Sequence, residues 1–245
     1  MRTFLNPSLF HPMELIINGI VNAIKLLFSG DPEVLQITFL SLKVSGIATG
    51  LSLLVGLPLG TVLAFGQFRG REFWLSLINT GMALPPVVVG LGVSLTLWRS
   101  GPLGTLSLMY TQTAMVIAQF IIAAPVVTGL TVAALQQLDP RLHLQLLGLG
   151  ASRWQSIWLL WREARLPLLA ALMAGFGAVI SEVGASMMVG GNLRYHTRVL
   201  TTAIVLENSK GNFDIAIALS VILLGLAYAV TLGLTWAQQR SVRRG

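Results

Sequence analysis

The sequence predicts an all-α integral membrane protein, and its composition and the length of its apolar runs carry this prediction. Of the 245 residues, 54% are hydrophobic and 10% are charged, and the mean hydropathy is +0.77. These values are more apolar than those of a soluble domain of this size. Most of the apolar runs reach the roughly 20 residues with which a helix crosses the hydrocarbon core of a bilayer.

Six apolar segments are candidates for membrane spans, within a single domain that covers residues 1–245. The first segment is the shortest, and at about 1.5 Å per residue it extends only about 24 Å. It therefore crosses the bilayer with a neighbour's support or lies in the interface. We expect six spans, with five spans plus an interfacial helix as the alternative. The segments are residues 13–28, 34–65, 73–98, 111–136, 166–189 and 213–236.

Prolines and glycines inside these segments predict how the helices bend and pack. A proline in a span removes a backbone N–H donor, so we expect broken or kinked helices at Pro58, Pro85–Pro86 and Pro125. Small residues four positions apart permit helices to approach closely in lipid. Such pairs are Gly46 with Gly50 and Gly56 with Gly60.

The distribution of arginines fixes the expected orientation. With six spans, arginines gather in the loops 67–72 and 137–165 and near both chain ends, whereas the loop 29–33 on the other side is acidic. By the positive-inside rule, the arginine-rich side and both termini are cytoplasmic, and the loops 99–110 and 190–212 are outside. The same bias accounts for the net charge of +7 without a nucleic-acid partner. The arginines are Arg2, Arg69, Arg71, Arg141, Arg153, Arg162, Arg165, Arg240, Arg243 and Arg244.

Several kinds of active site are excluded by the residues present. The chain has no cysteine, and His11, His143 and His196 are too scattered to suggest a metal cluster. The sequence has no Gly-x4-Gly-Lys-Ser/Thr segment to cradle nucleotide phosphates. Glu182 is the one acidic residue well inside a span, and no histidine accompanies it, as an intramembrane enzyme would require. We expect no catalytic residue, no metal and no cofactor bound by this chain.

The connector between the fourth and fifth segments, residues 138–167, is basic and aromatic. Asp139, which precedes a proline, favours a helix start, and Ser152 can cap a second helix. Gly148 and Gly150 favour a helix end between the two. The resulting unit is either an amphipathic hairpin with tryptophans at the lipid headgroups or an element that docks a protein partner. The tryptophans are Trp154, Trp158 and Trp161.

Within this connector, residues 149–154, Leu-Gly-Ala-Ser-Arg-Trp, resemble the core of the loop by which ABC importer permeases contact their ATPase subunits. Two features depart from the family pattern: residues 144–146 are Leu-Gln-Leu in place of Glu-Ala-Ala, and Pro167 lies four positions later than the family's proline. Four residues add about one helical turn, so the second helix can lengthen with nearly the same orientation. The resemblance implies that the coupling residues are Asp139, Arg141, Leu149, Gly150, Ala151, Ser152 and Arg153.

The resemblance covers most of the chain from Val34 onward. Residues 38–45, Thr-x4-Lys-Val-Ser, and 56–60, Gly-Leu-Pro-Leu-Gly, are similar to these permeases in general. Two further segments resemble the molybdate and tungstate branch of the family: residues 84–90, Leu-Pro-Pro-Val-Val-x-Gly, and residues 101–104, Gly-Pro-Leu-Gly. Residues 181–192, Ser-Glu-Val-Gly-Ala-Ser-x2-Val-Gly-Gly-Asn, and 197–204, Thr-Arg-Val-Leu-Thr-Thr-Ala-Ile, look most like tungstate permeases.

The resemblance implies a six-helix, type I-like permease subunit with a cytoplasmic coupling helix, in the cytoplasmic membrane of a prokaryote. It would import an oxyanion, tungstate first, with molybdate, sulfate or vanadate as alternatives. The implied partners are the lipid bilayer, a second copy of the chain, an extracytoplasmic oxyanion-binding protein and two ATPase subunits that hold ATP and Mg. A secondary transporter that needs no ATP is a further alternative, which leaves the connector without a role.

Six residues are candidates for the translocation pathway or its gate. We expect Glu182 to form a structural or gating ion pair, with Arg194 or Arg198 as the partner, because a bare carboxylate would repel an anion. Lys43 either extends to the outer interface or presents its charge to a cavity. The prolines either expose N–H groups to an oxyanion or bend a helix for packing. The candidates are Lys43, Pro85, Pro86, Ser181, Glu182 and Ser186.

Overall fold

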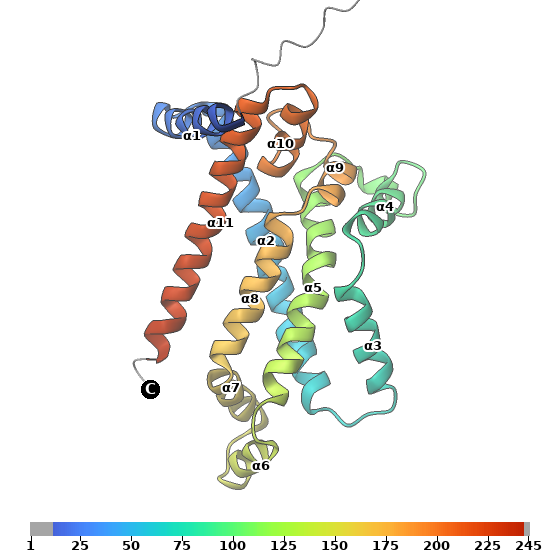
Figure 1. Cartoon of the computed structure of the whole chain (residues 1–245). Helices are drawn as coiled ribbons and strands as arrows, with labels where there is room; N and C mark the ends of the chain where they lie inside the picture. The colour runs from blue at the N-terminus through green and yellow to red at the C-terminus, as the bar shows by residue number, and fades with distance from the viewer. Residues whose placement is uncertain (1–11, 243–245) are drawn as a thin grey trace, which may run out of the picture.

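Long helices run side by side in the computed structural model, which describes residues 12–242 (Figure 1). The central pair is α2 (Pro32–Phe65) and α5 (Gln112–Gln136), flanked by α8 (Arg165–Ile180) and α11 (Phe213–Val242). The shorter elements are α1 (Pro12–Ser29), α3 (Arg71–Met82), α4 (Pro86–Leu97), η2 (Gly104–Leu106), α6 (Pro140–Gly148), α7 (Arg153–Glu163), α9 (Gly184–Gly190) and α10 (Leu200–Ser209). The chain ends, with Arg2, Arg243 and Arg244, lie outside the described residues.

Between three and five candidate membrane spans are present in the described residues. In the described residues, α2, α5 and α11 are each long and apolar enough to cross a bilayer. The bent pairs α3–α4 and α7–α8 raise the count to five if each pair forms one span. The all-helical prediction is therefore confirmed.

The close approach of α2 to α5 depends on two glycines of α2. A Cβ at Gly56 would lie 3.2 Å from the backbone nitrogen of Thr128, and a Cβ at Gly60 would lie 2.6 Å from Cγ2 of Thr131. The prediction of close packing is confirmed for this pair. The other pair, Gly46 and Gly50, has no atom of the described residues within 4 Å of a built Cβ.

Two of the expected spans are each divided into two helices. The segment 73–98 consists of α3 and α4, whose axes differ by 101° across a break before Pro86. The segment 166–189 consists of α8, which ends at Ile180, and the short α9. Pro58 and Pro125, in contrast, lie inside the continuous helices α2 and α5. The double proline thus ends a helix, whereas a single proline does not.

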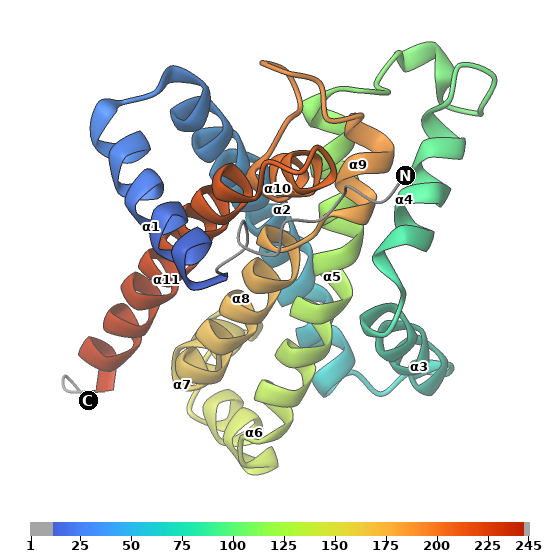
Figure 2. The ribbon, with the colours of Figure 1, turned by 45° about the horizontal axis from the view of Figure 1, so that its top comes forward.

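Helix α1 lies across one end of the bundle, packed on the first turns of α11, in the views of both Figure 1 and Figure 2. A Cβ at Gly19 would clash with the side chain of Ile217, so the two helices are in direct contact. The end of the bundle that α1 covers is the one where α2 begins (Figure 1). The number of spans stays a prediction, and the crosswise α1 is compatible with the alternative of five spans plus an interfacial helix.

Candidate functional site

The connector folds as the helix–glycine–helix unit that the sequence predicts, and we call α6, the turn 149–152 and α7 the hairpin. The Asp139 carboxylate accepts the Arg141 N–H at 2.8 Å and caps α6. Ser152 and Gln155 cap α7 reciprocally, with bonds of 2.8 and 3.3 Å. Gly150 has φ = +87°, a left-handed conformation that favours glycine. Local capping chemistry therefore fixes the shape of this turn.

The turn of the hairpin presents an apolar side chain to solvent. Leu149 is 86% exposed and Leu144 on α6 is 69% exposed. The charged residues Asp139, Arg141 and Arg153 are exposed beside them. An isolated chain gains nothing from an apolar side chain held in water, so such a surface indicates contact with a protein partner or with lipid. The structure brings all seven predicted coupling residues to this one end of the molecule (Figure 1).

Side-chain contacts connect the hairpin to the end of α2, and sequence reasoning missed them. Nδ1 of His143 lies 2.8 Å from Oγ of Ser156, which joins α6 to α7. The His143 ring stacks on Phe65, with centroids 5.6 Å apart and planes inclined by 19°. The indole N–H of Trp161 donates to Oγ1 of Thr61 at 2.8 Å. His143 is the one ring-bearing polar residue of α6, and this is the signal that could have identified it.

Glu182 lies just before α9, and its carboxylate caps that helix. Its two oxygens accept the backbone N–H groups of Ala185 at 2.9 Å and Ser186 at 3.0 Å. The Ser186 hydroxyl accepts from the Gln119 side chain of α5 at 3.3 Å. Glu182 is buried, and the positive end of α9 offsets its negative charge. The carboxylate is thus held by backbone donors.

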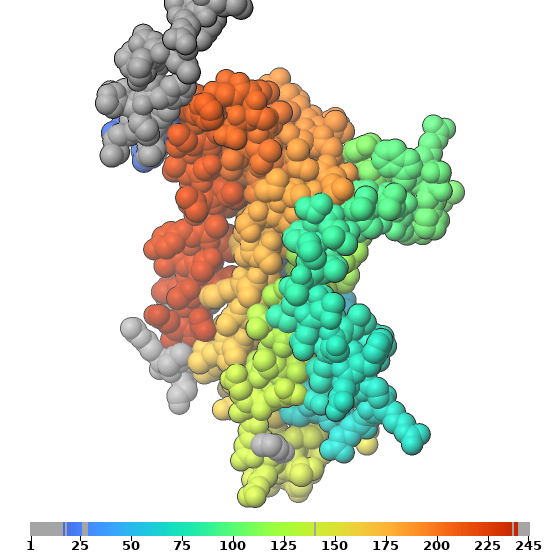
Figure 3. All heavy atoms as spheres, turned by 45° about the vertical axis from the view of Figure 1, so that its right-hand side comes forward, coloured from blue at the N-terminus to red at the C-terminus, as the bar shows by residue number. Residues whose placement is uncertain are grey.

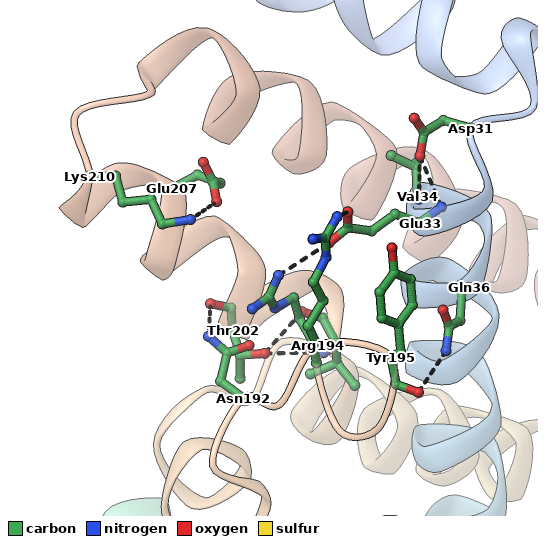
Figure 4. A network of polar contacts seen from close by, with 12 residues as sticks. Asp31, Glu33, Val34, Gln36, Asn192, Arg194, Tyr195, Thr202, Glu207 and Lys210 are labelled. Carbon is green, nitrogen blue, oxygen red and sulfur yellow. Dashed lines mark hydrogen bonds and ion pairs between the residues drawn. The ribbon is translucent and has the colours of Figure 1, made fainter.

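The predicted ion pair of Glu182 with Arg194 or Arg198 is wrong, because both arginines bind Glu33 at the start of α2 (Figure 4). Arg194 donates through Nε at 3.1 Å and Arg198 through Nη1 at 3.2 Å. The hydrogen bond to Glu33 raises the pKa of Arg194 further above its usual value. The arginines lie in the loop between α9 and α10, close to the first turn of α2, which makes Glu33 the nearer carboxylate.

The remaining pathway candidates fall into two places. Pro85 and Pro86 lie at the start of α4, where a Cβ on Gly184 of α9 would lie 2.7 Å from the Val87 side chain, so these prolines lie near Glu182. Ser181 is also there, exposed, with its hydroxyl donating to the Gly177 carbonyl at 2.8 Å.

Lys43 lies apart from the other pathway candidates. Its ammonium group donates to the Gln112 side chain at 3.0 Å, and Gln112 donates to the His196 carbonyl at 3.1 Å. Lys43 therefore joins α2, α5 and the loop before α10.

In the described residues, no group of three or more potential metal ligands is present.

Comparisons with known proteins place this arrangement in a family. The family model described as "binding-protein-dependent transport system inner membrane component" matches residues 56–244. The tungstate uptake system permease protein of Peptoclostridium acidaminophilum is 41% identical over 218 residues, covering 89% of this chain and 96% of the relative. The tungstate uptake system permease protein of Campylobacter jejuni is 34% identical, with coverage of 89% and 91%.

A solved structure supports the fold. The chain is similar to a crystal structure of a bacterial ABC transporter involved in the import of the acidic polysaccharide alginate, with a TM-score of 0.70 and 20% sequence identity. The match covers 95% of this chain and 90% of that chain. At this identity the likeness concerns the fold alone.

Proposed function

The chain belongs to the family of binding-protein-dependent transport system inner membrane components, and from this premise we propose that it is the permease through which an ABC importer moves tungstate into the cell. It is a multi-pass component of the inner membrane, and a transporter subunit rather than an enzyme. The similarity to two tungstate uptake permeases supports this substrate. Molybdate or another oxyanion is the alternative, since these anions share shape and charge.

We propose that the hairpin couples this permease to ATP hydrolysis in a separate ATPase subunit, which holds ATP and Mg. The exposed Leu149 supports this role most strongly, because a side chain so exposed gains stability when a partner covers it. Closure of two ATPase subunits would move α6, and the contacts His143–Phe65 and Trp161–Thr61 would carry that motion to α2. The close packing of α2 against α5 makes a rigid-body response the expected one.

Two further partners follow from the proposed assembly. A second copy of the chain would complete a two-sided pathway, and an apolar groove of about 520 Å³ between α4, η2 and α5 is a surface that a second copy could cover. Figure 3 shows the α4–η2 segment, in green, projecting from the bundle. On the outer side, the loop 191–199 offers charged groups to an oxyanion-binding protein.

The arrangement of α1 supports five spans: α2, α3–α4, α5, α8 continued by the short α9, and α11. The arginine-rich hairpin then lies in the cytoplasm, and the C-terminus lies on the same side. Helix α1 would lie in the outer interface, so the prediction that both termini are cytoplasmic applies to the expected topology of six spans and not to the alternative of five. A reporter that is active on one side of the membrane only, fused to the N-terminus, distinguishes the two topologies.

Uptake into proteoliposomes tests the proposed function. The chain is reconstituted with its ATPase and binding protein, and ATP-dependent tungstate uptake is measured for Leu149→Asp and for Leu149→Met as the matched control. Burying a leucine contributes about 1.5–3 kcal/mol, so the aspartate variant should bind the ATPase roughly 10- to 100-fold more weakly. The methionine variant should keep its activity. Equal uptake by both variants, or uptake without ATP, would contradict the coupling role and favour a secondary transporter.

A further inference from the structure

Helix α7 lies at a steep angle to α8, from which it is separated by Ala164. The two axes differ by 74°, and spanning helices tilt about 20° on average. Helix α7 therefore runs nearly in the plane of the membrane if α8 crosses it as proposed above. Its 11 residues extend about 16 Å, of which only about 0–9 Å lies along the membrane normal. The headgroup layer is roughly 5–7 Å thick on each side, so most of α7 stays at that depth.

The two faces of α7 differ in what they contact. The inner face holds the buried Ser156 and Leu160, together with Trp161, which reaches α2. On the opposite, exposed face of α7, Trp154 and Trp158 are 80% and 59% exposed. Because α7 is already packed on its inner side, the exposure of these two tryptophans has a reason other than incomplete folding.

The exposed face of α7 has the residue types that are typical of helices at a bilayer interface. Arg162 lies four positions after Trp158, and its guanidinium carbon is 5.7 Å from the centre of that indole ring. A groove of about 460 Å³ runs along the same face, lined by Ala151, Trp154, Gln155, Trp158 and Leu159. Tryptophan with arginine at a helix surface is typical of the headgroup layer, where rings meet the acyl boundary and cations meet phosphates.

Neighbouring elements place this face beside lipid. Figure 1 shows α7 at the height where α11 ends and α3 begins, whereas α6 projects further from the bundle. Those helix ends carry exposed tryptophans too, Trp236 near the end of α11 and Trp74 in the first turn of α3. Exposed tryptophans on three separate helices near this end of the bundle are typical of an aromatic belt at a membrane interface.

We propose that α7 lies in the cytoplasmic headgroup layer and that its Trp154–Trp158–Arg162 face binds phospholipid headgroups. The contact with the ATPase is then confined to α6 and the turn at Leu149. The hairpin is divided between two partners: its first helix meets protein and its second meets lipid. Such a division would hold α6 at a fixed distance from the membrane surface, where the ATPase contacts it.

The absence of cysteine from the chain permits a direct test. Single cysteines replace Trp154, Gln155 or Trp158 on α7, with Leu144→Cys on α6 and Ala174→Cys on α8 as references. The nitroxide-labelled full chain is reconstituted in phosphatidylcholine–phosphatidylglycerol vesicles, and collisions with oxygen and with a water-soluble nickel chelate give the depth of each label. Gln155→Cys keeps both tryptophans, so the test does not depend on variants that lose them.

Labels on α7 should lie within about 5–10 Å of the headgroup–acyl boundary and be shielded from the nickel chelate, whereas the Leu144 label should be open to it. The proposal is overturned if the α7 labels are as open as the Leu144 label, or if they become shielded only when the ATPase is added, which would make this face a protein surface. A water-exposed label at Ala174 would overturn the proposed topology as well.

Discussion

Replacing Glu182 with glutamine tests how the buried carboxylate is held. The two oxygens of Glu182 each accept one backbone N–H of α9, at 2.9 and 3.0 Å. A glutamine of the same shape has one acceptor oxygen, and its NH₂ group would face the second backbone N–H. One hydrogen bond to a charged group is therefore lost and two donors, the backbone N–H and the NH₂ group, face each other, at a cost of about 2–3 kcal/mol.

Thermal unfolding of the purified chain in detergent measures this cost. For a chain of this length, about 1 kcal/mol corresponds to roughly 2–4 °C, so Glu182→Gln should lower Tm by about 4–12 °C. Ser181→Ala is the matched control, because that hydroxyl is exposed and its loss should change stability by about 0.5 kcal/mol or less. We also expect reduced transport, since α9 packs against α4 at the division of two spans.

A double variant distinguishes the cap from an ion pair. If the carboxylate is held by backbone donors, the effects of Glu182→Gln and Arg198→Ala should add within about 0.5 kcal/mol. A coupling energy of about 1 kcal/mol or more between the two substitutions would instead indicate an ion pair between Glu182 and Arg198. The reasoning would also be refuted if Glu182→Gln unfolded at the temperature of the wild type.

Two further predictions use the same unfolding assay. Gly60→Ala should lower stability by about 1–3 kcal/mol because its Cβ would overlap α5, whereas Gly46→Ala, with open space around it, should be neutral or slightly stabilising; equal effects would exclude the packing argument. Glu207 near the end of α10 should make this region sensitive to acid. A hydrogen bond from Asn212, and then one from Lys210, lowers the pKa of Glu207 below 4.5. A carboxylate whose pKa is lower in the folded state stabilises the fold at pH values above its unfolded pKa. This stabilisation is lost as the pH falls through the folded-state pKa. Wild type should therefore lose Tm relative to Glu207→Gln only below about pH 4.5, and parallel pH profiles would contradict this.

The sequence predicted best what is encoded within a few neighbouring residues. Asp139 and Ser152 cap their helices because each hydrogen bond closes over two or three positions. Consecutive prolines at 85 and 86 end a helix, since a residue before proline avoids the helical conformation and the second proline suits a helix start. Pro58 alone costs one hydrogen bond, which the packing of α2 tolerates.

Contacts between distant parts of the chain could not be predicted in this way. Glu33 and Arg194 are 161 positions apart, so no local pattern favours Glu33 over Glu182 as the partner. The spacing of Gly46 and Gly50 equals that of Gly56 and Gly60, yet α5 covers only the second pair in the described structure. Which face of α2 meets α5 depends on the whole bundle. Local patterns therefore fixed the elements, whereas tertiary packing chose their partners.

Helix α2 connects the two functional ends of the molecule. Its 34 residues extend about 51 Å, and its inner end contacts the hairpin through Thr61 and Phe65. Its outer end binds the loop before α10 through Glu33, and also through Gln36, which donates to the Tyr195 carbonyl at 2.8 Å. Because α2 is one continuous helix, a displacement of the hairpin would reach the loop before α10 without passing through a break in the helix. A binding protein on that loop and an ATPase on the hairpin would therefore act on the same rigid element from opposite ends.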